Sequence, residues 1–209
     1  MTISGTGGIF SIAPQNGKVG NGVFPDAYPW RRYRATSANI APQQMQDLLP
    51  PETGGPIVPN YGFKVGTFFG GDVDLIPRTA GDLGFLLYAL MGSSTSVAVS
   101  GAPGAYRHDF NISSDGGLTL PWMAVRRFVP GPSGQTLGET AWDCKAAQMR
   151  MAFGNSGITA LNFGIVGRRW KQEINPTWTY DGPAESGEST PILGNGHLRL
   201  AGTEYPIVG

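Results

Sequence analysis

The sequence has very few of the side chains that bind metals or act as nucleophiles. Its 209 residues include one cysteine, Cys144, and two histidines, His108 and His197. A single cysteine excludes an internal disulfide and a cysteine-rich zinc site, and the two histidines are not spaced as zinc ligands are. Cys144 lies in an alternating segment and is predicted to be a buried, small hydrophobic residue. We expect no metal and no cofactor.

Charge is also scarce, and it is evenly divided. Charged residues make up 14% of the chain, and 15 basic residues balance 15 acidic ones. An average soluble domain has about 25% charged residues. A dedicated nucleic-acid-binding protein usually has an excess of lysine and arginine, so this class is disfavoured. Hydrophobic residues at 40% are nevertheless enough to fill a core, which makes global disorder unexpected.

The chain has no long hydrophobic run. The longest apolar block, Leu83–Met91, is far shorter than the roughly 20 residues that a membrane-spanning helix needs. Residues 1–20 lack the basic segment and apolar core of a secretory signal. We therefore expect a protein that is made in the cytoplasm and has no membrane partner.

What the sequence has in abundance is glycine, with 32 residues, and proline, with 17. Both disfavour long helices and favour turns. Strands are predicted where residue types alternate with a period of two, or where a segment lies between two turn signals. These segments are 29–40, 63–76, 105–113, 118–130, 139–153 and 158–170. Turn signals at 114–117 and 154–157 predict two hairpins, 105–113 with 118–130 and 139–153 with 158–170. The predicted fold is mainly β.

One segment, 79–92, is predicted to be a helix. Thr79 and Asp82 can form a capping box at its start, and Gly92 is placed to end it. Its leucines recur at the spacing of one helix face: Leu83, Leu86, Leu87 and Leu90. We expect this face to pack against the strands, with Leu87 in the core.

Glycine- and proline-rich segments divide the chain. Residues 1–28 are predicted to be an extended arm, 29–170 a β domain, and 171–196 a polar linker. Residues 197–209 are predicted to be the first strand of a second domain or a C-terminal arm. Within the β domain, 40–60 is predicted to be a proline-broken loop, and loops of this length are usually functional.

Two carboxylates stand out in the strand 63–76. Asp72 and Asp74 alternate with Val73 and Leu75, and the adjacent Gly70-Gly71 suggests a bulge or a bend. Paired carboxylates on one strand face could carry out acid–base chemistry or hold a cation. A solvated or subunit-contacting face of an alternating strand accounts for the same pattern, and we prefer this interpretation.

No motif of an enzyme class supports catalysis. The sequence has neither a nucleophile elbow nor a phosphate-binding glycine loop. A Ser–His–Asp set needs only to meet in space, but both histidines lie in predicted strands. We expect no enzymatic activity and no catalytic residues.

Three arginine doublets occur along the chain: Arg31-Arg32, Arg126-Arg127 and Arg168-Arg169. Each adjoins an aromatic residue, as in a site that stacks single-stranded nucleic acid. Because the net charge is zero, we favour the alternative, in which these arginines pair with acidic groups of the same or a neighbouring subunit.

Residues 68–92, FFGGDVDLIPRTAGDLGFLLYALMG, resemble the tail tube proteins of long-tailed bacteriophages. The shared pattern is a strand that leads into a short capped helix, followed by a strand with an aromatic and basic centre, LTLPWMAVRRFVPG. A hairpin completes the pattern with Asp143-Cys144-Lys145 in one strand and Gly157, Gly164 and Gly167 in or beside the other. The resemblance covers about residues 30–170.

This resemblance implies a β-sandwich or β-barrel with one flanking helix. Its subunits would form trimeric or hexameric rings, and stacked rings would form the tube through which the viral genome passes. The implied location is the virion. The implied partners are other copies of the chain, other tail proteins (terminator, distal tail and tape measure proteins), and viral DNA only transiently in the channel. Residues 194–208 resemble the opening strand of a second such domain.

If strands of each subunit close a shared barrel, polar side chains must face its channel. We expect Asp72 and Asp74 there, since carboxylates repel phosphate whereas arginines would grip DNA. The arm 1–28 and the loop 40–60 are expected to lie across neighbouring subunits. Subunit contacts are expected at Arg31, Arg32, Arg126, Arg127, Arg168 and Arg169.

Two other functions are compatible with the sequence. The first is another virion β-protein, such as a tail terminator, a distal tail component or a decoration protein. The second is an enzyme or a carbohydrate-binding module at the tail tip, for which Trp170, Trp178 and Tyr180 would supply exposed aromatic rings.

Overall fold

The structure is a computed structural model that describes residues 8–20, 29–48, 62–78, 83–112, 120–131, 134–152, 159–178, 197–200 and 203–206. Its elements, in chain order, are β1 (Ile9–Pro14), β2 (Arg31–Tyr33), β3 (Ala35–Leu48), β4 (Gly62–Leu75), α1 (Leu83–Met91), β5 (Gly92–Ala98), β6 (Tyr106–Ile112), β7 (Met123–Pro130), β8 (Thr136–Ala152), β9 (Ala160–Ile174), β10 (His197–Leu200) and β11 (Thr203–Pro206). The mainly β fold is confirmed.

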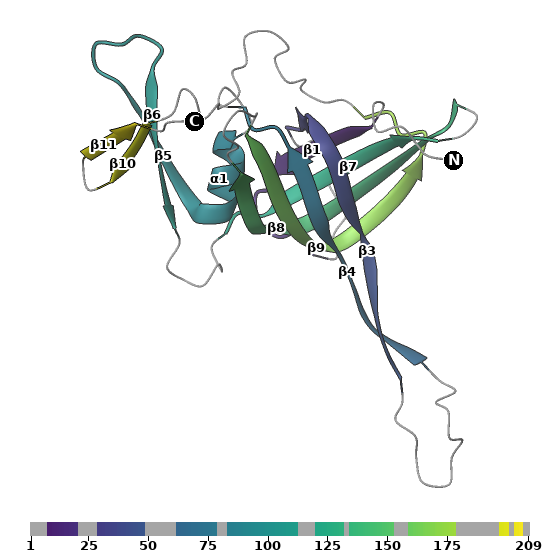
Figure 1. Ribbon diagram of the computed structural model, residues 1–209. Coiled ribbons are helices and arrows are strands. Elements are labelled where there is room, and N and C mark those ends of the chain that lie inside the picture. Colours follow the sequence, from purple (N-terminus) through teal and green to yellow (C-terminus); the bar gives the residue numbers. More distant parts are fainter. Residues whose placement is uncertain are drawn as a thin grey trace, which may run out of the picture.

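Seven strands form one antiparallel sheet in the order β2-β1-β7-β8-β9-β4-β3. The sheet curls strongly, so that β1 approaches β3 and the two ends of the sheet come together (Figure 1). Only Arg34 separates β2, at one end of the sheet, from β3, at the other. The chain itself therefore connects the two ends, and we call the curled sheet the barrel.

The hydrophobic core lies on the inner face of the barrel. All seven strands and α1 contribute side chains to it, because alternation turns every second residue of a strand inward. The buried core residues are Phe10, Ile12, Tyr33, Ile40, Phe69, Val73, Leu75, Leu86, Ala89, Met123, Val125, Ala141, Cys144, Ala146, Leu161, Phe163 and Ile165. One continuous core thus holds the elements together.

Helix α1 packs against β8 and covers part of this core. The helix is confirmed, but its inward face is centred on Leu86 and Ala89, which are 1% and 0% exposed. Leu87, which the sequence placed in the core, is only half-buried and lies outside the core cluster. The leucine spacing could not define the buried face of the helix, because almost every residue of α1 is apolar. The predicted cap at 79–82 lies outside the described residues.

Two glycines adopt backbone conformations that other residues rarely reach. Gly92, at a φ of +99°, follows the last residue of α1 and ends the helix as predicted. Gly71, at a φ of +144°, lies so close to β3 that an added Cβ would be 2.0 Å from the Asn39 carbonyl oxygen. The strand pairing stays in register through Gly71. The glycine pair therefore permits a close approach between β3 and β4 rather than a bulge.

The expected N-terminal arm is in part a strand of the barrel. β1 lies between β2 and β7 in the sheet, and Phe10 and Ile12 are 3% and 1% exposed. Ile9–Pro14 therefore packs on its own subunit, contrary to the expectation that residues 1–28 lie across a neighbour. The ladder partners of β1 are far away along the chain, so no local pattern could reveal them.

A β-bulge in β8 anchors the segment that follows β1. Asp143, at a φ of +53°, lies at a register shift between β7 and β8. Its carboxylate accepts hydrogen bonds from the backbone N–H groups of Val19, at 2.7 Å, and Gly20, at 2.8 Å. The side chain of Gln15 accepts from the backbone N–H of Asp143 at 2.8 Å.

Several predicted boundaries are wrong. Residues 40–48 belong to β3 rather than to a loop, and 49–60 lie outside the described residues. β6 pairs with β5 in a separate two-stranded sheet, so the predicted hairpin between 105–113 and 118–130 is absent. The β8–β9 hairpin is confirmed. β9 continues to Ile174, four residues into the predicted linker.

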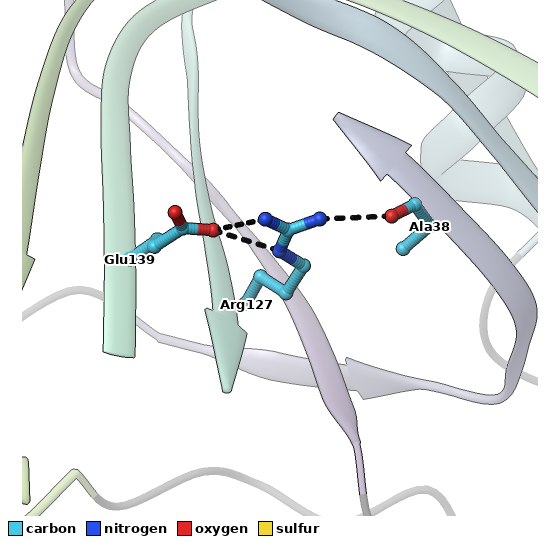
Figure 2. Close-up of polar contacts among 3 residues, drawn as sticks. All are labelled: Ala38, Arg127 and Glu139. Atoms are coloured by element: carbon cyan, nitrogen blue, oxygen red, sulfur yellow. Dashed lines mark hydrogen bonds and ion pairs between the residues drawn. The ribbon is translucent and has the colours of Figure 1, made fainter. Parts of the chain in front are cut away.

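Arg127, on β7, connects its part of the curled sheet to the end strand β3 from inside the barrel mouth. Its guanidinium binds the carboxylate of Glu139, on β8, through both Nε, at 2.8 Å, and Nη2. Nη1 donates to the backbone carbonyl oxygen of Ala38, on β3, at 3.0 Å (Figure 2). One side chain thus bridges β7 and β8 to β3, which no described strand pairs on this side.

We predict that Arg127→Met lowers the free energy of unfolding by about 3 kcal/mol, because it leaves a buried carboxylate without its cation. The side chain of Glu139 is only 8% exposed. The double variant Arg127→Met/Glu139→Gln should recover part of the loss, and Arg168→Met, at an exposed position, serves as the control. Chemical denaturation at neutral pH measures these changes. Equal stability of Arg127→Met and the wild type would contradict the bridging role.

Candidate functional site

A row of polar side chains crosses β3, β4, β9 and β8 on the outer face of the barrel. Asp72 and Asp74 lie in this row, while Val73 and Leu75, which alternate with them, are 0% and 4% exposed in the core. Directly paired residues of neighbouring strands share a face. The row therefore includes the ladder partners of both aspartates, namely Ser37, Asn39, Asn162 and Gly164. We call this row the polar face.

Asp74 is held by hydrogen bonds from both neighbouring strands. Ser37 Oγ donates to its Oδ2 at 2.5 Å, and Asn162 Nδ2 donates to its Oδ1 at 2.8 Å. These donors favour the charged form and hold the pKa of the Asp74 carboxyl below 3.8, although desolvation opposes them. The carboxylate is therefore fixed in position as well as charged.

Asp72 is bound from one side. Gln148, at a register shift of β8, reaches over Gly164 and donates from Nε2 to Asp72 Oδ1 at 3.2 Å. A Cβ at Gly164 would lie 2.6 Å from the Gln148 side chain and 3.0 Å from Asp72 Oδ1. The glycine therefore makes room for this contact. The polar face therefore holds two carboxylates among neutral amides and hydroxyls, and it also carries one exposed cation, Arg150, the ladder partner of Asn162 on β8.

Each of the two aspartates accepts hydrogen bonds from neutral side chains, Asp74 from Ser37 and Asn162 and Asp72 from Gln148. Within the described residues, no cluster of three or more histidine, cysteine, aspartate or glutamate side chains could hold a metal ion. None of the described helices is long and apolar enough to cross a membrane.

The remaining candidates for chemistry lie apart from the polar face. Cys144 is buried in the core, as predicted, and burial raises the pKa of its thiol far above the usual range. His108 Nδ1 lies 2.7 Å from Ser96 Oγ on the exposed β5–β6 hairpin. The neighbouring Asp109 instead accepts from Arg107 Nε at 3.1 Å. In this hairpin the serine and histidine are therefore not completed by a carboxylate.

The arginine doublets are not brought together. Arg126 is 3% exposed and stacks on two tryptophan rings of its own chain, and Arg127 binds Glu139. The partners that the structure gives these two arginines lie within the chain, and their contact with other subunits stays a prediction. Subunit contact likewise stays a prediction for the other four arginines, whose side chains are exposed: Arg31, Arg32, Arg168 and Arg169.

The sequence also missed the partners that fix the polar face. Asn162 and Gln148 are in predicted strands, and their alternation could have marked them as outward-facing. Ser37 could not have been found in this way, since its contact depends on β3 pairing with β4, which the predicted loop concealed.

We predict that Asn162→Ala raises the pKa of Asp74 toward its usual range, because it removes the strongest donor to the charged form. The lowered pKa stabilises the fold above pH 3.8, and this contribution is lost as the pH falls through the pKa of the folded state. The stability difference between wild type and variant should therefore be constant near neutral pH and shrink below pH 3.8. NMR titration of the carboxyl carbon and denaturation at several pH values measure both effects. An unchanged titration in the variant would contradict the assignment.

Comparisons with known proteins give distant likenesses only. No protein-family model matches the chain, and no curated protein matches it. Among solved structures, the chain is similar to the cap of the anti-feeding prophage, a tube-terminating cap, with a TM-score of 0.40, 9% identity, and coverage of 83% of this chain and 91% of that one. It is also similar to an Hcp protein, with a TM-score of 0.30, 13% identity, and coverage of 82% and 94%.

Proposed function

We propose that the chain is a structural subunit of a bacteriophage tail tube, in which rings of subunits stack around a channel for the viral genome. The observation that carries this proposal is a two-stranded arm that leaves the barrel. The resemblance of residues 68–92 to tail tube proteins agrees with it. A tube of this kind needs extensive contacts between copies and no catalytic residues.

The arm consists of residues 42–48 and 62–68. β4 pairs with β9 only from Phe69 to Leu75, but its pairing with β3 continues to Leu48 and Gly62. The arm therefore extends away from the barrel, as Figure 1 shows. Residues 41–47 are exposed, and Met45 is 55% exposed. Because an isolated two-stranded hairpin is only marginally stable in water, we infer that a second copy of the chain covers the arm.

The departure of the arm also leaves a strand edge open on the barrel. Residues 169–174 of β9 pair with β8, but no described strand pairs with their other edge. A groove between this edge and the root of the arm is lined by Phe68, Arg168 and Arg169, among others. Open edges favour pairing with another chain. The arm and the open edge are different surfaces, as the head-to-tail contacts of a ring require.

We infer that the polar face lines the channel. Around Asp72 and Asp74 it carries two carboxylates and one arginine, Arg150, and the carboxylates are held by hydrogen bonds within the subunit. Carboxylates held in this way would repel the phosphates of DNA, so that DNA could slide. The channel would lie between the subunits of a ring and not inside the barrel of one subunit. A face on the outside of the barrel can therefore line it.

Electron microscopy of the purified protein tests the proposed function. We predict tubes of uniform width for the wild type, whereas a terminator or decoration protein would give single rings or monomers. Replacing residues 44–67 by Asn-Gly should leave the barrel folded, as judged by circular dichroism, and abolish tubes. Tubes of normal width and length from this shortened, folded variant would contradict the role of the arm.

We further predict that the double variant Asp72→Lys/Asp74→Lys still assembles but slows genome ejection, most strongly at low salt, because lysine binds phosphate and salt screens this attraction. The neutral double variant Asp72→Asn/Asp74→Asn is the matched control and should eject DNA at a rate near that of the wild type. Ejection is followed by the release of dye-accessible DNA. A lysine variant with the rate of its asparagine control would show that the polar face does not line the channel.

A further inference from the structure

Arg126 lies between two indole rings on the outer face of the barrel. Its guanidinium carbon is 4.1 Å from the centre of the Trp30 ring and 4.5 Å from the centre of the Trp178 ring. Arg126 and Trp30 are each 3% exposed, and Arg126 Nε donates to Thr140 Oγ1 at 3.4 Å. A desolvated cation gains most from the negative faces of aromatic rings. The stack is therefore a strong and specific contact.

Trp178 reaches this position because residues 175–178, which we call the strap, fold back over β8. Asn175, at a φ of +51°, turns the chain after β9. Its backbone N–H donates to the Thr136 carbonyl oxygen at 2.8 Å, and its Oδ1 accepts from the Thr136 N–H at 2.8 Å. Trp178 Nε1 donates to Glu173 Oε2 at 3.1 Å. The strap is thus held by side chains and a single backbone contact rather than by a strand ladder.

Gly138, on β8, leaves the space that the strap fills. A Cβ at this position would lie 2.5 Å from both the Trp178 ring and the Pro176 ring. The backbone of Gly138 is not in the left-handed region, so any residue could adopt it. The glycine is therefore required by the strap and not by the strand.

We propose that Trp30, Arg126 and Gly138 form a socket for an indole side chain, and that Trp178 is a detachable plug for it. The socket belongs to the barrel alone, since Trp30 and Thr140 hold Arg126 without help from the strap. The plug fastens the chain that follows β9 to the outer face. The ligand class of the site is a tryptophan-bearing peptide segment, and its occupant in the free subunit is the strap. This inference does not depend on the proposed tube function.

Peptide binding to an emptied socket tests the proposal. In the Trp178→Ala variant the socket is open, and the peptide Asn-Pro-Thr-Trp-Thr should bind at one saturable site in isothermal titration calorimetry. The wild type, whose socket is filled, should bind it at least tenfold more weakly. The double variant Trp178→Ala/Gly138→Val and the peptide Asn-Pro-Thr-Ala-Thr are the controls and should show no saturable binding. Failure of the single variant to bind the peptide, or equal binding by the double variant, would overturn the proposal.

Hydrogen exchange tests the plug without removing it. Gly138→Val should displace Trp178 and expose the Thr136 amide, whose exchange should become faster by roughly tenfold or more. Gly66→Val is the matched control, because a Cβ at Gly66 would meet no atom within 4 Å. Unchanged protection of Thr136 in Gly138→Val would overturn the plug. Both experiments use the free subunit, so their outcome is separate from whether tubes form.

Discussion

The barrel depends on one constraint, which is that its two ends meet without a complete ladder of backbone hydrogen bonds. Among the described strands, β3 pairs with β4 alone, and its other edge faces β1 across the barrel mouth. Arg127 meets this constraint by binding Glu139 and the Ala38 carbonyl oxygen together. A planar guanidinium with several fixed donors suits such a bridge, whereas lysine would offer a single point charge. The continuous core behind the bridge then holds all seven strands and α1 together.

The outer face of the barrel has two different halves. Over β7 and β8, it is covered by Trp30 and Trp178, which enclose Arg126. Over β3, β4 and β9, it carries the polar face, with side chains that bind one another and leave the surface hydrophilic. One half is thus occupied by the subunit itself, and the other is free for water or a polyanion to approach. This division is what makes the polar face the better candidate for a channel lining.

The arm and the open edge of β9 have a common origin in the divergence of β4 from the sheet beyond Phe69. Natural proteins usually protect such edges by charge, by short length or by pairing. Here the arm is long, its charged residues are Asp47 and Lys64, and residues 42–47 are exposed. A chain that presents both a projecting ribbon and an unpaired edge is suited to pairing with copies of itself, which is the physical basis of the proposed tube.

Sequence alone determined the elements whose signals are local. Alternation and turn residues predicted β8 and β9 as a hairpin, Gly92 ended α1, and the phase of Asp72 and Asp74 against Val73 placed both carboxylates away from the core. These features depend on neighbours within one turn or one hairpin. Only the tertiary structure decided that β1 enters the sheet, that β3 extends through the predicted loop, and that Arg126 and Arg127 bind within the subunit. Their partners are far away in the sequence, and contacts of that kind are selected by the packing of the whole barrel, which no local pattern encodes.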